Sequence, residues 1–134
     1  MKILLIDDSS TMRMLMVKML REIGYTDFIA VDNAEEAIPL AFNSKFDVIL
    51  TDWNLPKMSG LDFVKHLKTT PSTKNIPVIM ITSIHDRAAI LKALKTGIQG
   101  YILKPVSKEI VMAKLKEVEE KLQADNAEKG GEKR

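Results

Sequence analysis

Cysteine is absent from this 134-residue sequence, which excludes a disulfide framework and thiolate metal ligands and fits a reducing compartment. No apolar run approaches the roughly 18 residues that a membrane-spanning helix needs. Asp7 and Asp8 interrupt the N-terminal apolar run too early for a secretion signal. Neither sign of charge dominates, since 20 basic and 18 acidic residues leave a net charge of +2. With no helix-turn-helix pattern or basic stripe either, the sequence predicts a cytoplasmic protein that binds neither nucleic acid nor membrane.

Short apolar runs alternate along the chain with segments that repeat apolar residues at helical spacing. The expected strands cover residues 2–6, 26–31, 48–50, 76–81 and 99–103. The expected helices begin at residue types that favour helix N-termini, near Ser9, Asn33, Ser59, Asp86 and Ser107. Strands that alternate with helices in this way predict an α/β fold with a parallel sheet covered on both faces. With right-handed crossovers, the chain should form a doubly wound, flavodoxin-like (βα)5 three-layer sandwich with strand order 2-1-3-4-5.

Two segments depart from this regular pattern. Pro39 lies inside the second expected helix, where its missing backbone N–H predicts a kink or a loosened stretch between Pro39 and Ser44. From Gln123 to Arg134 the apolar period is lost, which predicts a flexible charged tail. The folded domain should therefore cover residues 1–122.

The carboxyl ends of the expected strands carry reactive polar groups. Asp7 and Asp8 follow the first strand, Asp52 the third, Thr82 the fourth and Lys104 the fifth. In the expected order, the first and third strands are neighbours at the edge where such sheets bind ligands, so the carboxylates should converge. Crowded carboxylates repel one another, and with an exposed turn carbonyl they form an oxygen-rich site that suits Mg²⁺. A hydroxyl and an ammonium group across the pocket would hold the oxygens of a phosphoryl group.

Each of these groups also has an ordinary structural interpretation. Asp52 alone could equally cap a turn, and the pair Asp7–Asp8 could favour the N-terminus of the helix that follows. Lys104 could be a solvated residue at a strand end. Only their expected convergence at one edge of the sheet favours a chemical site.

In combination, the motifs resemble the receiver domains of two-component response regulators, especially the stand-alone chemotaxis type. The resemblance covers roughly residues 2–122 and rests on Asp7-Asp8, Ser10-Thr11-Met12-Arg13, Asp52-Trp53-Asn54-Leu55-Pro56, Gly60, Thr82, Tyr101 and Lys104-Pro105. It implies a signalling switch that accepts a phosphoryl group with Mg²⁺ and catalyses only its own phosphorylation and dephosphorylation.

The resemblance also implies roles for the acidic residues. Asp52 would be the phosphoacceptor, and it would share the metal with Asp8 and the backbone carbonyl of Asn54. Asp7 would act on the metal mostly through water.

Across the pocket, the resemblance assigns Thr82 and Lys104 to the phosphoryl oxygens and Tyr101 to a change of rotamer on activation. The bond between Lys104 and Pro105 is expected to be cis. Ser83 and Ile84 depart from the family pattern, which often has alanine and then a polar residue at these positions. Rates of phosphorylation and hydrolysis therefore cannot be carried over.

The implied partners are a histidine kinase, as phosphodonor, and a downstream target protein. The target would bind the face formed by the fourth helix, fifth strand and fifth helix of an otherwise monomeric protein. Lysines distributed over this face, Lys92, Lys95, Lys108 and Lys116, favour an acidic or amphipathic partner segment, although they could simply solvate the helices.

Three other functions fit the sequence less well. A phosphohydrolase of the haloacid dehalogenase type would need an Asp-x-Asp motif, which Asp7-Asp8-Ser9 does not supply. A flavodoxin-like electron carrier would need glycines in the loop occupied by Ser9-Ser10-Thr11. A receiver that binds partners without phosphorylation would not need the full set of site residues.

Overall fold

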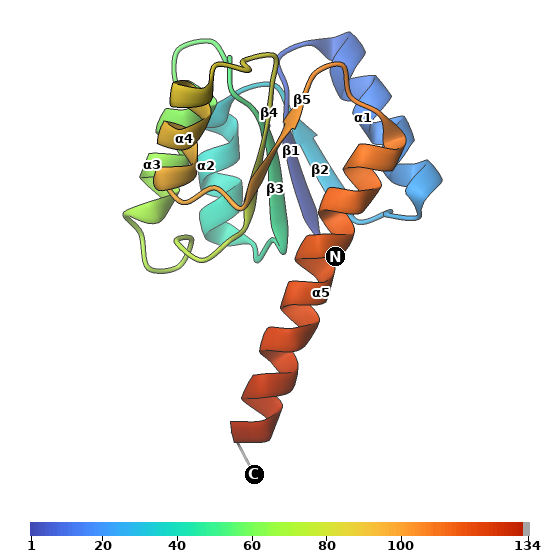
Figure 1. The fold of residues 1–134 in the computed structure, drawn as a ribbon, viewed down its shortest axis with the longest axis vertical. Helices are drawn as coiled ribbons and strands as arrows, with labels where there is room; N and C mark the ends of the chain where they lie inside the picture. The colour runs from blue at the N-terminus through green and yellow to red at the C-terminus, as the bar shows by residue number, and fades with distance from the viewer. Residues whose placement is uncertain (133–134) are drawn as a thin grey trace.

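Strands and helices alternate along the chain in the structure, a computed structural model that describes the backbone of residues 1–132 and the side chains of residues 1–126 (Figure 1). The strands are Ile3–Ile6 (β1), Phe28–Val31 (β2), Val48–Asp52 (β3), Val78–Thr82 (β4) and Gly100–Leu103 (β5). The helices are Ser10–Ile23 (α1), Ala34–Asn43 (α2), Gly60–Lys68 (α3), Arg87–Lys95 (α4) and Lys108–Glu132 (α5). No helix among residues 1–132 is long and apolar enough to cross a membrane.

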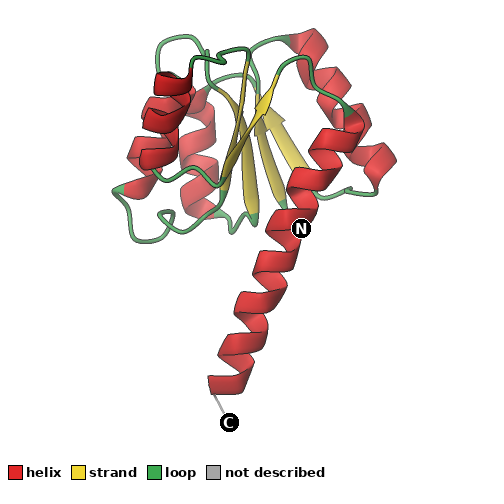
Figure 2. Cartoon of the chain, viewed as in Figure 1, coloured by secondary structure: helices red, strands yellow, loops and turns green. Residues whose placement is uncertain are grey.

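The strands form one parallel sheet in the order β2-β1-β3-β4-β5, which confirms the predicted topology (Figure 2). The register aligns the carboxyl ends of the two central strands, because Ile6 of β1 is paired with Thr51 of β3. Asp7 and Asp52, the next residue on each strand, are thereby brought to the same edge of the sheet.

Two apolar layers hold the helices on the sheet. Helices α1 and α5 cover one face, where Met16 and Leu115 pack with Leu50 and Ile81. Helices α2, α3 and α4 cover the other, where Phe63 is fully buried against the strands. Burial of a side chain of this size contributes about 1.5–3 kcal/mol. Met12 and Met19 are half-buried, and Met19 packs at the edge of the first layer.

The start of α1 fixes the path of the chain beside the sheet edge. The Ser9 hydroxyl caps the helix by accepting a hydrogen bond from the Met12 N–H. At the other end, Gly24 adopts a φ of 117°, a left-handed conformation that suits glycine. The acidic pair Asp7–Asp8 therefore lies between a strand end and a helix start, both of which are well defined.

The structure differs from two expectations. Helix α2 continues through Pro39 to Asn43, so the loosened stretch predicted there does not form. Its buried alanines, Ala37 and Ala41, anchor the helix to the sheet on both sides of the proline and offset the lost hydrogen bond. The expectation of an irregular tail from Gln123 was also wrong, because α5 continues as a helix to Glu132 and extends beyond the sheet (Figure 1). Residues 133–134 lie outside the described part.

Candidate functional site

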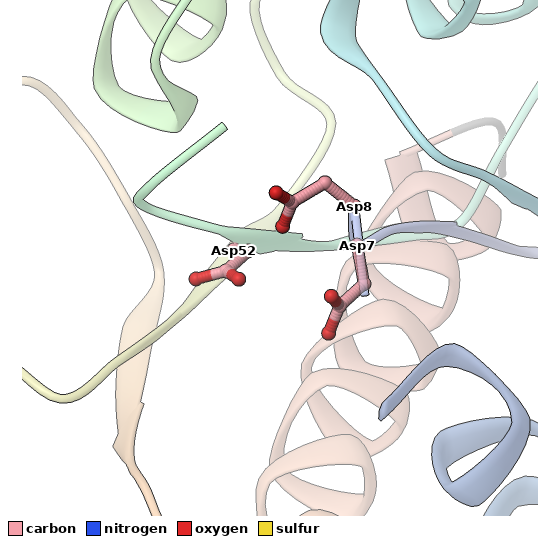
Figure 3. A group of neighbouring side chains, drawn as sticks. All are labelled: Asp7, Asp8 and Asp52. Atoms are coloured by element: carbon pink, nitrogen blue, oxygen red, sulfur yellow. The ribbon is translucent and has the colours of Figure 1, made fainter. Parts of the chain in front are cut away.

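Three carboxylates converge at the carboxyl edge of the sheet, as the sequence predicts (Figure 3). One oxygen from each of Asp7, Asp8 and Asp52 lies within 4.8 Å of the others. Asp7 and Asp52 are only 2% and 4% exposed, whereas Asp8 is open to solvent. The cluster is therefore buried on one side and accessible on the other, as a site that exchanges ligands requires.

Asp7 is held by the start of α1. Its Oδ1 accepts a hydrogen bond of 2.9 Å from the Ser9 N–H. Burial raises the pKa of the Asp7 carboxyl; the Ser9 hydrogen bond lowers it, the Asp52 charge raises it, and Lys104 and Asp8 act in opposite directions. Because burial dominates and the pKa is raised, the ionised form of Asp7 lowers the free energy of unfolding at neutral pH. This cost shrinks as pH falls through the raised pKa and is gone below the ordinary value of 3.8.

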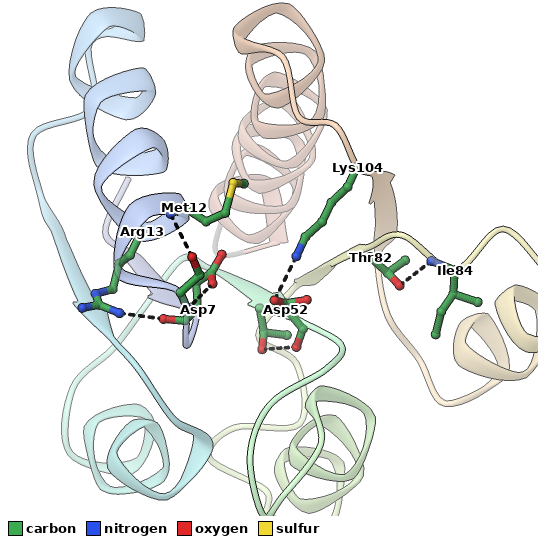
Figure 4. A network of polar contacts seen from close by, with 9 residues as sticks. Asp7, Met12, Arg13, Asp52, Thr82, Ile84 and Lys104 are labelled. Atoms are coloured by element: carbon green, nitrogen blue, oxygen red, sulfur yellow. Dashed lines mark hydrogen bonds and ion pairs between the residues drawn. The ribbon is translucent and has the colours of Figure 1, made fainter.

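Asp52 is paired with a positively charged side chain, Lys104. The Lys104 Nζ donates a hydrogen bond of 3.0 Å to Asp52 Oδ2 from the loop that follows β5 (Figure 4). The two residues are 52 positions apart in sequence, and the β3-β4-β5 order brings them together. Removing the lysine would leave the buried carboxylate beside its acidic neighbours without this partner. The Lys104–Pro105 peptide bond is cis, as predicted.

The backbone of Asp52 is fixed by contacts that the sequence did not reveal. The buried Thr51 hydroxyl donates a hydrogen bond of 3.0 Å to the Asp52 carbonyl oxygen. The next residue, Trp53, donates its N–H to Ile81 and accepts at its carbonyl from the Gly60 N–H, at 3.0 and 2.8 Å. A threonine at the penultimate strand position was the only signal of this arrangement.

Thr82 lies at the end of β4, next to β3 in the sheet. Its hydroxyl oxygen accepts a hydrogen bond of 2.9 Å from the Ile84 N–H (Figure 4). Because that bond uses only a lone pair, the hydroxyl proton remains to be donated to another oxygen. The role of Thr82 toward a phosphoryl group stays a prediction.

Tyr101 is half-buried on β5 and packs against the apolar layer of α2, α3 and α4, whereas its neighbour Ile102 packs on the opposite face. Successive residues of β5 therefore face opposite sides of the sheet. Tyr101 pairs in register with Met80, two residues before Thr82 on the adjacent strand, so Tyr101 and Thr82 lie on the same face of the sheet. Its change of rotamer stays a prediction.

Asn54 is exposed in the loop after β3, two residues beyond Asp52. Its carbonyl as a metal ligand also stays a prediction. The two histidines, His66 and His85, are exposed.

The donor set of the acidic cluster fits Mg²⁺. Magnesium prefers oxygen ligands, uses few from the protein and keeps waters, and the cluster offers carboxylate oxygens with one side open to solvent. The repulsion from Asp52 and Asp8 that helps raise the Asp7 pKa is the kind of charge crowding that a divalent cation would relieve.

Comparison with known proteins agrees with the fold. The sequence matches the response regulator receiver domain family over residues 3–116. It is 34% identical over 122 residues to the chemotaxis protein CheY of Pseudomonas aeruginosa, with 91% of this chain and 98% of that protein covered. It is 41% identical over 119 residues to CheY1 of Helicobacter pylori, with 88% and 96% covered. A solved structure of the chemotaxis response regulator CheY4 of Vibrio cholerae superposes with a TM-score of 0.81 at 30% identity, covering 87% of this chain and 97% of that one.

Proposed function

The chain belongs to the response regulator receiver domains of two-component signalling systems, and we propose that Asp52 is its phosphoacceptor, with Mg²⁺ bound by Asp7, Asp8, Asp52 and the Asn54 carbonyl. The observation that carries the proposal is the placement of Asp52. Its buried carboxylate lies 3.0 Å from the Lys104 ammonium and within 4.8 Å of oxygens of Asp7 and Asp8.

In the proposed reaction, an Asp52 oxygen attacks the phosphorus of a phosphohistidine on a histidine kinase. The P–N bond breaks, the imidazole leaves with its electron pair and takes up a proton, and Asp52 becomes an acyl phosphate. Hydrolysis reverses the modification, because water attacks the phosphorus, inorganic phosphate leaves and the carboxylate returns. The chain would thus catalyse only its own phosphorylation and dephosphorylation.

The protein contributes positioning and charge to this chemistry. Lys104 contacts Asp52 Oδ2 and would bind a phosphoryl oxygen once the carboxylate is converted to an acyl phosphate. The Thr82 hydroxyl would donate its proton to a second oxygen. A bound Mg²⁺ supplies charge neutralisation for the transferring group.

We also propose that the signal leaves by contact with an acidic or amphipathic segment of a target protein. The face formed by α4, β5 and the start of α5 carries exposed apolar side chains: Leu91 (49%), Leu94 (39%), Leu103 (39%) and Ile110 (44%). Exposed lysines on α4, Lys92 and Lys95, would complement acidic groups that flank an apolar helix face, whereas Lys108 forms an ion pair with Glu22 of α1 at 3.3 Å.

The chemistry can be tested with a small phosphodonor. Acetyl phosphate and Mg²⁺ should add one base-labile phosphoryl group per chain, measured by intact mass, and EDTA should prevent the addition. A chain that gains no phosphoryl group, or gains a base-stable one, would contradict the proposal.

A further inference from the structure

Arg13, in the first turns of α1, reaches back to the end of β1. Its Nη1 donates a hydrogen bond of 2.9 Å to the backbone carbonyl oxygen of Asp7 (Figure 4). Its own N–H is bonded to the Ser9 carbonyl within the helix, at 2.9 Å. The guanidinium therefore connects a rigid helix to the main chain of the acidic cluster.

The carbonyl that Arg13 binds belongs to the peptide unit between Asp7 and Asp8. A peptide unit is planar, so fixing its oxygen also fixes the direction in which the chain enters Asp8. Asp7 has two further anchors, since its N–H donates to the Val31 carbonyl at 3.1 Å and its carboxylate accepts from the Ser9 N–H. The first of these bonds fixes the backbone nitrogen of Asp7 and the second fixes the Asp7 side chain. Arg13 instead binds the carbonyl oxygen of the peptide unit that joins Asp7 to Asp8.

We propose that Arg13 is a positioning residue for the metal site: it holds the Asp7–Asp8 peptide so that both carboxylates face Asp52. The inference rests on the proposed function, in which these carboxylates hold Mg²⁺. Arg13 itself touches neither the metal nor the phosphoryl group in this account.

The positive charge of Arg13 should change metal affinity in the direction opposite to its positioning role. A positive charge beside an acidic cluster repels a cation, so by Coulomb's law alone its removal should strengthen Mg²⁺ binding. If Arg13 acts by positioning, its removal should weaken Mg²⁺ binding. Groups that orient metal ligands typically change affinity about 10- to 100-fold when they are removed. The sign of the change therefore separates the two effects.

Arg13 is also a residue that can be replaced without opening a cavity in the core. It is half-buried and lines an open groove between α1, β2 and α2, together with Val31, Glu36 and Pro39. Arg13→Met keeps an unbranched stem of helix-forming type but lacks a donor, so the variant should fold. Arg13→Lys keeps a donor and the charge. Lys18→Met, on an exposed position of the same helix, removes the same charge away from the site and is the matched control.

The first measurement needs no metal. In ¹H–¹⁵N spectra recorded in EDTA, the Asp8 amide should report the hydrogen bond, because its nitrogen shares a peptide unit with the Asp7 carbonyl. Arg13→Met should shift the Asp8 resonance, Arg13→Lys should return it toward the wild-type position, and Lys18→Met should leave it in place. An Asp8 resonance that is unmoved in Arg13→Met would overturn the proposal whatever the metal does.

The second measurement is a Mg²⁺ titration followed by the fluorescence of Trp53, the single tryptophan, which directly follows Asp52. Arg13→Met should bind Mg²⁺ about tenfold more weakly, and Arg13→Lys should lie closer to the wild type. Unchanged or tighter binding by Arg13→Met would overturn the positioning role while the wild type still binds. Absence of saturable binding by the wild type would instead overturn the metal site of the proposed function.

Discussion

Gly60, the first residue of α3, lies directly against the backbone carbonyl of Asp52, and a Cβ atom at Gly60 would overlap that oxygen. The Gly60 N–H also donates to the Trp53 carbonyl, so the start of α3 contacts two successive carbonyl oxygens at the end of β3, those of Asp52 and Trp53. Space for the main chain of Asp52 thus depends on the absence of a side chain at position 60.

Replacing Gly60 with alanine should therefore displace Asp52. Overpacking of this kind costs typically about 1–3 kcal/mol, and Gly60→Ala should lower the free energy of unfolding by that amount and slow phosphoryl uptake from acetyl phosphate. Gly100→Ala is the control, because a Cβ there would meet only the Lys114 side chain at 4.0 Å. If Gly60→Ala had the stability of the wild type and took up phosphoryl groups at the same rate, the close contact between Gly60 and Asp52 would have no effect on stability or phosphorylation.

The burial of the Asp7 carboxylate, together with the charge of Asp52, raises its pKa and predicts a gain in stability when its charge is removed. In EDTA at pH 7, Asp7→Asn should raise the free energy of unfolding by about 1 kcal/mol, since asparagine can still accept the Ser9 N–H bond. Urea unfolding would measure it, with Asp27→Asn, at an exposed position, as the control of equal charge.

Magnesium should reverse this ranking. A ligand at about 100 times its dissociation constant stabilises the folded state by about 2.7 kcal/mol, and Asp7→Asn should gain less than the wild type because it has lost a donor. An equal response of the two proteins to Mg²⁺ would speak against Asp7 as part of the site.

Tyr25 should make stability depend on alkaline pH. Burial, then the charge of Glu119 and the hydrogen bond that the hydroxyl donates to Glu119 at 3.3 Å, raise the pKa of Tyr25 above its ordinary value of 10.0. A raised pKa means that the contribution is present below the pKa of the unfolded chain, near pH 10, and is lost as pH rises through the folded value.

The difference in free energy of unfolding between wild type and Tyr25→Phe should accordingly be constant below pH 9 and shrink above pH 10, where the wild type loses more stability. Urea unfolding across this range, with both proteins in the same buffers, cancels the titration of other groups. If the difference in free energy of unfolding stayed constant up to pH 11, the ionisation of Tyr25 would not contribute to the pH dependence of stability.

Tyr101 should affect the output more than the chemistry. Because it lies on the same sheet face as Thr82 and packs against the apolar layer that includes Ala93 of α4, movement of Thr82 toward a phosphoryl group should free space for its ring. Tyr101→Ala, trapped with beryllofluoride, should bind a target protein more weakly while it takes up phosphoryl groups at nearly the wild-type rate. Equal target affinity of the two trapped proteins would exclude the coupling.

Much of the fold and of the site followed from the sequence because both depend on strand ends. The apolar runs fix where β1 and β3 stop, and a parallel order brings Asp7 and Asp52 to one edge whatever the details of packing. Lys104 was predicted for the same reason, since it follows β5 directly.

The contacts that fix main-chain atoms were not predictable in the same way. The Thr51 hydroxyl and the Arg13 guanidinium bind carbonyl oxygens, and such bonds depend on rotamers and on the exact position of a helix relative to a strand. The course of α5 past Leu122 was missed for another reason. Residues 123–132 lack an apolar period, and the helix formers among them are interspersed with weak ones, Asp125, Asn126, Gly130 and Gly131, so the sequence carried no clear signal that the helix continues.

The central claim, that Asp52 accepts the phosphoryl group, is tested most directly by the rate of uptake from acetyl phosphate with Mg²⁺ in Asp52→Asn. Asparagine keeps the shape of the side chain but removes the nucleophilic carboxylate, and Asp62→Asn, at an exposed position on α3, is the matched control. The account predicts that Asp52→Asn takes up no base-labile phosphoryl group while Asp62→Asn labels like the wild type. Uptake by Asp52→Asn at the wild-type rate would contradict it.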